Sequence, residues 1–367
     1  MRKTLFFILL FNLGLWVDSP AQVLQPGFKP DEYREILKIL SVTARDSLKN
    51  RDMYPRTYSR IYRSQPMGLD NLWELWQKDR VAVVSIRGTT KSEVSWLANL
   101  YAAMVPATGD LQITDSIIFQ YNLAENPRAS VHIGWLISTA FLAQEIVPTL
   151  DSLDKAGIRD VIIAGHSQGG AISYLLTSYL YSLQTKGDLS SDIQFKTYAS
   201  ASPKPGNLYY AYDYEFKTQG GWTFNVVNTV DWVPEVPFSI QTINDFNAVN
   251  PIAGAKEAIN KQSFFKRLIM RRVYRKMVRP MNKAQKNFEK YLGEKGSKTI
   301  KKKLKEYKKP EWSHNNNFVR TGQTIILMAD EEYAEEFPDS DSNFFVHHDV
   351  KAYLFLLDKQ YKGQYEE

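Results

Sequence analysis

Ser167 lies at the centre of a Gly-His-Ser-Gln-Gly-Gly hexapeptide, residues 165–170. An apolar run over 161–164 precedes it and an amphipathic run over 171–176 follows. This pattern predicts a strand, a sharp turn and a helix, with the serine at the turn. The flanking glycines allow strand and helix to approach closely and allow the serine a strained backbone conformation. Because the first N–H groups of the helix would face an oxygen that becomes negative, the segment could form acyl-enzymes and cleave esters.

A serine hydroxyl is a poor nucleophile at neutral pH, so this chemistry requires a histidine and an orienting carboxylate. Asp231 follows the apolar run 222–228, and His347 and His348 follow near the C-terminus. The order Ser, Asp, His is that of the α/β-hydrolases. From its position alone, Asp231 could also be an ordinary turn aspartate.

The elements expected to position these residues alternate between strand and helix. We predict helices over 31–50 and 133–153, the second with a possible kink at Pro148, and strands over 81–86, 195–199 and 222–228. Residues 69–77 are expected to form a short connecting segment. The alternation predicts an α/β fold with a mostly parallel central sheet and helices on both faces.

Composition limits the chemistry further. The chain has 367 residues, of which 44% are hydrophobic, enough for one large domain over 22–367. It contains no cysteine, which excludes disulfides, a thiol nucleophile and cysteine metal ligands. With five histidines and no His-Glu-x-x-His motif, we expect neither a metal nor a cofactor.

The N-terminus has the pattern of a secretory signal peptide. Arg2 and Lys3 precede an apolar stretch over 5–17, and a small-residue cleavage site ends at Ala21. The apolar stretch is shorter than the roughly 20 residues of a membrane span. We therefore expect residues 1–21 to be removed and the protein to be exported, either periplasmic or secreted. An uncleaved anchor is the alternative.

Six ordered blocks resemble the class 3 lipases, the fungal-lipase-like branch of the α/β-hydrolases. They are Ile86-Arg87-Gly88-Thr89 with Trp96 downstream, Val131-His132-Ile133-Gly134-Trp135, the hexapeptide 165–170, Ala201-Ser202-Pro203-Lys204-Pro205-Gly206-Asn207, Asn228-Thr229-Val230-Asp231-Trp232-Val233-Pro234, and His348-Asp349-Val350-Lys351-Ala352-Tyr353. The resemblance covers about residues 75–240 and 317–358.

The resemblance implies Ser167 as nucleophile, Asp231 as the orienting carboxylate and His348 as the base. His348 is preferred to His347 because of its spacing to Tyr353. The oxyanion hole would be formed by Thr89 and by the N–H of Gln168. The remaining two histidines of these blocks, at 132 and 166, would have structural parts beside the site.

The implied activity is hydrolysis of carboxylic esters of lipids, in the manner of a triacylglycerol lipase or phospholipase. The alternatives are an esterase for soluble or carbohydrate-linked esters, and a non-catalytic protein that binds lipids or polyanions on the same fold. One departure from the family concerns Asn99, where the family often has aspartate. The nearby segment 92–107 could be a mobile lid or could pack on the sheet.

A basic insertion separates Asp231 from His348, over about residues 250–312. Between 256 and 309 it has 20 Lys and Arg against four Glu, a net +16, so the rest of the chain sums to −10. Apolar residues recur every four positions from Phe265 to Met281, which predicts an amphipathic helix that stops near Pro280. We expect chiefly a helical cap on the hydrolase core. Docking on an anionic membrane or lipid surface through segment 256–309 is the alternative, and nucleic acid is not expected.

Overall fold

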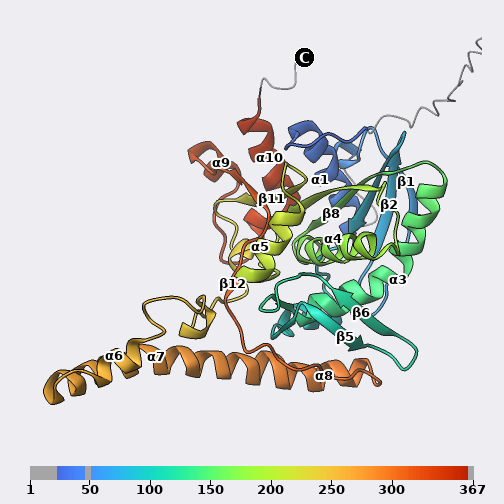
Figure 1. The fold of residues 1–367 in the computed structure, drawn as a ribbon. Coiled ribbons are helices and arrows are strands. Elements are labelled where there is room, and N and C mark those ends of the chain that lie inside the picture. Colours follow the sequence, from blue (N-terminus) through green and yellow to red (C-terminus); the bar gives the residue numbers. More distant parts are fainter. Residues whose placement is uncertain (1–22, 46–50, 363–367) are drawn as a thin grey trace, which may run out of the picture.

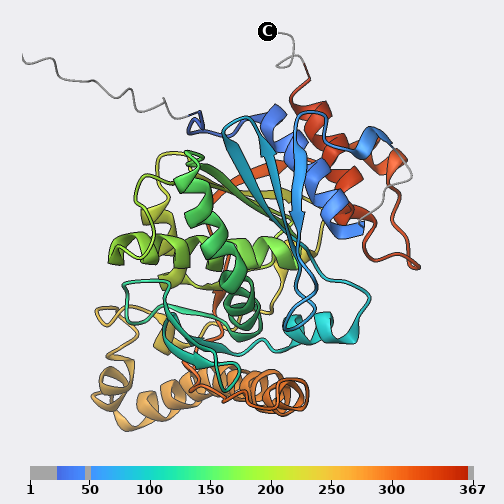
Figure 2. The same cartoon turned by 90° about the vertical axis from the view of Figure 1, so that its right-hand side faces the viewer.

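The computed structural model describes residues 23–45 and 51–362 (Figures 1 and 2). The predicted signal peptide, residues 1–21, lies outside the described residues. The helices are α1 (Pro30–Arg45), α2 (Glu93–Leu100), α3 (Ile133–Lys155), α4 (Gln168–Lys186), α5 (Leu208–Lys217), α6 (Ala255–Asn260), α7 (Phe264–Phe288), α8 (Lys295–Lys303), α9 (Glu331–Glu336) and α10 (Val350–Gln360).

A seven-stranded sheet forms the centre of the molecule, in the order β1-β2-β3-β8-β9-β11-β13. Its strands are β1 (Ser59–Arg63), β2 (Trp73–Lys78), β3 (Val81–Ile86), β8 (Asp160–His166), β9 (Gln194–Ser200), β11 (Thr223–Asn228) and β13 (Gln323–Leu327). The five strands from β3 to β13 are parallel, and β1 and β2 continue one edge antiparallel. The prediction of a mostly parallel sheet is confirmed.

Two smaller sheets lie beyond the ends of the parallel strands. One has the order β12-β10-β7-β4, and the other is the hairpin β5-β6. Their strands are β4 (Met104–Pro106), β5 (Thr108–Gln112), β6 (Ile118–Asn122), β7 (Ser130–His132), β10 (Gly206–Asn207) and β12 (Phe318–Val319).

Helices cover both faces of the central sheet, as the α/β-hydrolase fold requires. Figure 2 shows α1 and α10 on one side and α3 and α4 on the other. Each pair of helices closes its own apolar core against the sheet. The helix α3 is long and apolar enough to cross a membrane, but 67% of its most apolar window is buried inside the protein, as expected of a core helix. It continues through Pro148.

The expectation of a connecting segment over 69–77 was wrong, because residues 73–78 form the strand β2. Glu74 obscured the strand pattern, since a charge inside an apolar run is typical of an exposed loop. This carboxylate is fully buried and paired. It accepts from Arg60 at 2.9 Å and from the Trp76 indole at 2.8 Å, and it also pairs with Arg63. These partners compensate much of the cost of burying the charge.

The insertion forms α6, α7, a π-helical turn η4 (Glu289–Glu294) and α8. The expected end of the amphipathic helix near Pro280 was wrong, because α7 continues to Phe288. A proline inside a helix removes one backbone hydrogen bond and crowds the preceding turn. Here Lys276, whose carbonyl oxygen loses that partner, is exposed, so solvent can satisfy the freed oxygen.

The expected helical cap describes only the second half of the insertion. Phe288, Ile300 and Tyr307 are buried against the hydrolase body. The first half of α7 instead leaves its apolar side chains exposed, with Phe265 76% and Met277 66% accessible. Figure 1 shows α6 and the start of α7 extending beyond the body. For this part of the insertion the cap prediction was wrong.

Candidate active site

Ser167 sits in the sharp turn between β8 and α4, with φ +60° and ψ −130°. A non-glycine residue with positive φ is strained, and such strain clusters at functional positions. The turn needs glycine on both sides. A Cβ on Gly165 would lie 2.1 Å from the carbonyl carbon of Gly169, and one on Gly169 would lie 2.3 Å from the Ile86 oxygen. The predicted strand, turn and helix are therefore present.

Asp231 and His348 are brought together from opposite ends of the insertion. Asp231 follows β11, and His348 ends the short helix η5 (Val346–His348) just before α10. Nδ1 of His348 lies 2.7 Å from Oδ2 of Asp231, and both side chains are almost fully buried. The carboxylate also accepts from the N–H of Val233 at 3.0 Å and from the hydroxyl of Tyr353 at 2.8 Å. Burial first, and then the Asp231 charge, raise the pKa of Tyr353.

The other ring nitrogen of His348, Nε2, is buried and faces no hydrogen-bond partner among the described residues. With Nδ1–H donated to Asp231, Nε2 carries the lone pair. His348 and Ser167 line the same pocket, although no hydrogen bond joins Nε2 to the Ser167 hydroxyl in this structure.

A buried chain of hydrogen bonds fixes the backbone of His348. Nε2 of His166 lies 2.7 Å from the carbonyl oxygen of His348, which can only accept, so His166 is the donor. Nδ1 of His166 then accepts from Ser200 at 3.0 Å, and Ser200 in turn bonds Tyr33 at 2.7 Å. Burial, followed by the nearby His348, lowers the pKa of His166 to about 4. His166 is thus a neutral support near the site.

His347 points elsewhere. Its Nδ1 bonds the hydroxyl of Tyr333 at 2.9 Å and its Nε2 bonds Asp339 at 2.8 Å. It therefore braces the loop before α10, and His348 is the member of the pair that contacts Asp231.

Thr89 follows β3 and lines the pocket beside Gln168, the first residue of α4. The N–H of a first helical residue has no acceptor within its helix. Asn99 sets the direction of the Thr89 hydroxyl: the indole of Trp135 can only donate, to Oδ1 of Asn99 at 3.0 Å, so Nδ2 donates to Thr89 at 2.8 Å. The Thr89 oxygen is thus an acceptor in this contact, and its own proton is directed to Oε1 of Gln168, 3.5 Å away.

His132, from the sequence block 131–135, contacts the same two residues, Asn99 and Trp135. Its Nε2 lies 3.2 Å from the carbonyl oxygen of Asn99, and its ring stacks on Trp135 at 3.7 Å between centroids. Burial lowers the pKa of His132 to about 3, so it is neutral at ordinary pH.

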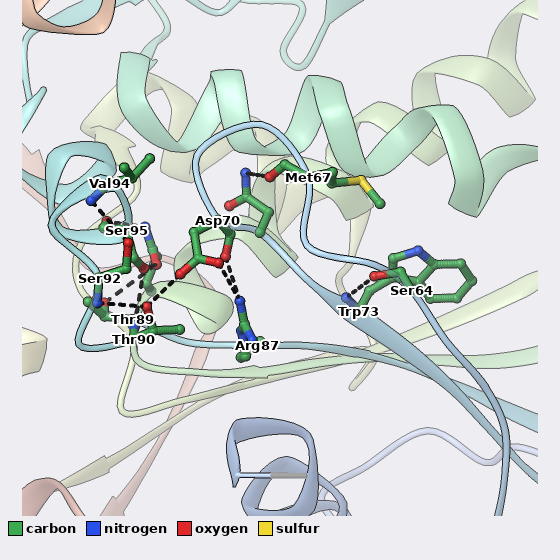
Figure 3. A network of polar contacts seen from close by, with 12 residues as sticks. Ser64, Met67, Asp70, Trp73, Arg87, Thr89, Thr90, Ser92, Val94 and Ser95 are labelled. Atoms are coloured by element: carbon green, nitrogen blue, oxygen red, sulfur yellow. Dashed lines mark hydrogen bonds and ion pairs between the residues drawn. The ribbon is translucent and has the colours of Figure 1, made fainter. Parts of the chain in front are cut away.

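Asp70 anchors the loop that carries Thr89, a role that the sequence did not indicate (Figure 3). Its side chain accepts from Thr90 at 2.6 Å and from Arg87 at 3.0 Å, and its carbonyl oxygen also accepts from Arg87. The N–H of Thr90 donates to Ser95 at 3.1 Å, which ties the loop to α2. In the sequence, only Arg87, two residues before Thr89, indicated that this loop needs a partner, and no motif marked Asp70 as that partner.

The pocket that holds these groups has a volume of about 910 Å³. Beyond its polar floor, its lining is aliphatic and aromatic, from α1, α2, the loops after Asp231 and the insertion: Leu40, Trp96, Leu100, Phe238, Phe288, Leu292 and Phe345. Several of these are well exposed, Phe238 by 76% and Leu100 by 56%. Such walls suit a long acyl chain. Within the described residues, no group of three or more His, Asp or Glu could hold a metal ion.

The model of the class 3 lipases, described as "Lipase (class 3)", matches residues 83–241. This match places residues 83–241 of the chain in the class 3 lipase family. The range matched by the lipase family contains Thr89, Ser167 and Asp231, whereas His348 and the insertion lie after it.

Solved lipases are similar to this chain at low identity. A Rhizomucor miehei lipase in complex with its propeptide is 19% identical, covers 60% of this chain and 73% of its own, and has a TM-score of 0.43. A lipase from Rhizopus microsporus var. chinensis is 21% identical, with 57% and 69% covered and a TM-score of 0.42. The Lip2 lipase of Yarrowia lipolytica is 16% identical, with 58% and 76% covered and a TM-score of 0.43. No curated protein sequence matches the chain.

Proposed function

We propose that this class 3 lipase family member is a serine hydrolase that cleaves carboxylic esters of lipids through an acyl-serine intermediate. One observation carries the proposal. His348, whose Nδ1 lies 2.7 Å from Asp231 and whose Nε2 has no partner among the described residues, shares a pocket with Ser167 in its strained turn.

The reaction follows from the roles of these groups. Oγ of Ser167 attacks the ester carbonyl carbon while its proton passes to Nε2 of His348. The carbonyl oxygen becomes negative and receives hydrogen bonds from the N–H of Gln168 and from the N–H and hydroxyl of Thr89. The bond to the alcohol breaks, and the leaving oxygen takes the proton from His348. A water molecule then repeats the sequence on the acyl-serine and releases the carboxylic acid.

The apolar pocket supports a lipid ester as the substrate. Its volume of about 910 Å³ lies in the range of small-molecule sites. A soluble or carbohydrate-linked ester would leave most of the apolar lining unused. We therefore propose acylglycerols or phospholipids as the substrates.

The test is hydrolysis of p-nitrophenyl esters from short to long acyl chains, by wild type and Ser167→Ala side by side. Turnover that rises with chain length and is lost in the variant supports a lipid ester hydrolase. Turnover confined to short chains would indicate an esterase. A folded protein that binds lipid but turns over no ester would contradict the proposed catalysis.

We further propose that the protein is exported, with cleavage after Ala21, and meets its substrate at an anionic lipid surface through segment 256–309. The N–H groups of Val23 and Leu24 donate to Asp160 at 2.8 and 3.1 Å, so a cut before them would leave this anchor intact. N-terminal sequencing of protein from periplasm and culture medium tests export. An uncleaved N-terminus in the cell membrane would contradict it.

A further inference from the structure

A second apolar hollow lies beside the projecting arm, which we define as residues 255–281. Its volume is about 540 Å³. The arm contributes Ile269, Val273 and Met277, and the preceding loop contributes Ile243, Phe246 and Ile252. None of its lining residues lines the catalytic pocket, so the two hollows are separate.

The arm side of this hollow is open to water. Ile269 is 64%, Val273 56% and Met277 66% exposed. Phe264 and Phe265 at the start of α7 are 65% and 76% exposed. A contiguous exposed apolar surface of this kind marks an interaction site.

The same stretch of helix is strongly cationic. Residues 266–279 include seven Lys and Arg and no acidic residue. Within the described part of the chain, none of these cations is within ion-pair distance of a carboxylate; Arg271 donates instead to the Asn260 side chain at 2.7 Å. Positive charge and apolar side chains therefore share one accessible surface, as in helices that lie at lipid interfaces.

The helix of the arm leads on to the wall of the catalytic pocket. Phe288 and Leu292, on the continuation of the same helix, form part of the catalytic wall. Met281, at the near end of the hollow, lies seven residues before Phe288, about 10 Å along a helix. An amphiphile held near Met281 would thus lie about 10 Å along the helix from that wall.

We propose that the hollow of the arm binds an acyl chain of an anionic lipid in a membrane or lipid aggregate, while the cations of 266–279 contact the head groups. This inference rests on the proposed contact with a lipid surface and assigns it to the arm. An acyl chain fits the hollow, and an anionic head group complements the charge. A nucleic acid would leave the hollow unfilled, and a second copy of this chain docked arm to arm would bring like charges together.

Binding to vesicles tests the charge component, by co-sedimentation with phosphatidylcholine alone or mixed with phosphatidylglycerol. The double variant Arg271→Glu with Arg275→Glu should lower partition onto the anionic vesicles at least about 25-fold, since each lost cation near such a surface contributes about fivefold. The matched control is Lys302→Glu with Lys303→Glu, the same charge change on exposed residues of α8. An equal loss in both pairs would overturn the assignment to the arm.

Occupation of the hollow is tested separately. Because the chain has no cysteine, Met270→Cys provides a single thiol in the lining for a polarity-sensitive fluorophore. Its emission should shift to shorter wavelength with lysophosphatidylglycerol and stay unchanged with glycerol phosphate. The same shift with glycerol phosphate, or none with either probe, would contradict an acyl-chain site.

The hydrolase proposal and the arm proposal can fail independently. Val273→Asp and Met277→Asp lie outside the catalytic pocket and should leave hydrolysis of a short soluble ester unchanged while lowering vesicle binding. Unchanged circular dichroism shows that each variant is folded. Wild-type vesicle binding by both folded variants would overturn the arm proposal, whereas loss of Ser167-dependent turnover is measured only by the ester assay.

Discussion

The orienting role of Asp231 is tested by Asp231→Asn, which changes one atom type and removes one charge. Oδ1 accepts from the Val233 N–H at 3.0 Å, so the amide oxygen of the variant should keep that position. The NH₂ group then faces Nδ1 of His348, now 2.7 Å from a carboxylate oxygen. An NH₂ group can only donate, so Nδ1 must lose its proton and Nε2 must carry it. In this neutral tautomer Nε2 carries a hydrogen and has no lone pair to accept the proton of Ser167.

The expected loss is about 10⁴-fold in kcat, the size measured for the same carboxylate-to-amide change in a serine protease triad. This corresponds to about 5 kcal/mol in the barrier. The assay is steady-state hydrolysis of the best p-nitrophenyl ester, with urea unfolding to show an intact fold. Asp245→Asn is the matched control, because Asp245 is also buried but caps the turn at Thr242 at 2.6 Å, outside the catalytic pocket. If Asp231→Asn keeps more than about a tenth of wild-type kcat, the tautomer argument is refuted.

Three further outcomes follow from the hydrogen bonds. Thr89→Val should lower kcat by about 10²-fold through loss of an oxyanion donor, and an unchanged kcat would exclude the hydroxyl from the reaction. Tyr353→Phe should lower the free energy of unfolding by about 3 kcal/mol, because the Asn228 N–H loses its acceptor at 3.1 Å and Asp231 loses a donor; a urea midpoint equal to that of wild type would contradict this. The pKa values of about 3 for His132 and about 4 for His166 lie below the ordinary 6.5, so the unfolded chain takes up protons first. Stability should therefore be full above pH 6.5 and fall towards pH 4, by about 3 kcal/mol for His166 alone, and a flat urea midpoint over that range would refute it.

The sequence was most informative where the chemistry depends on neighbours in the chain. The turn around Ser167 could be predicted because glycine spacing and flanking patterns are local. Asp231 and His348 could be predicted by their order and by resemblance, although 117 positions separate them. Tyr353 entered only as a spacing marker, and its bond to Asp231 could not be inferred, because it depends on how α10 packs against β11.

The hydrogen bonds between residues far apart in the sequence that support the site could not be predicted. Asp70 lies 17 positions before Arg87 in a turn without a motif, and Tyr33 reaches Ser200 across 167 positions. Such contacts depend on tertiary packing, which leaves no periodic signal. The prediction of a helical cap failed at the arm for a different reason. An apolar stripe on a helix predicts a partner for that stripe, and here the body of the hydrolase does not supply it.

The central claim is that Ser167 is the nucleophile, and covalent trapping tests it most directly. Wild type would be incubated with a long-chain alkyl p-nitrophenyl phosphonate, and the intact mass and the modified peptide would be measured. We expect one phosphonyl adduct per chain, on Ser167, with none in Ser167→Ala and a greatly reduced rate in Asp231→Asn. An adduct on another residue, or equal labelling of Ser167→Ala, would contradict it.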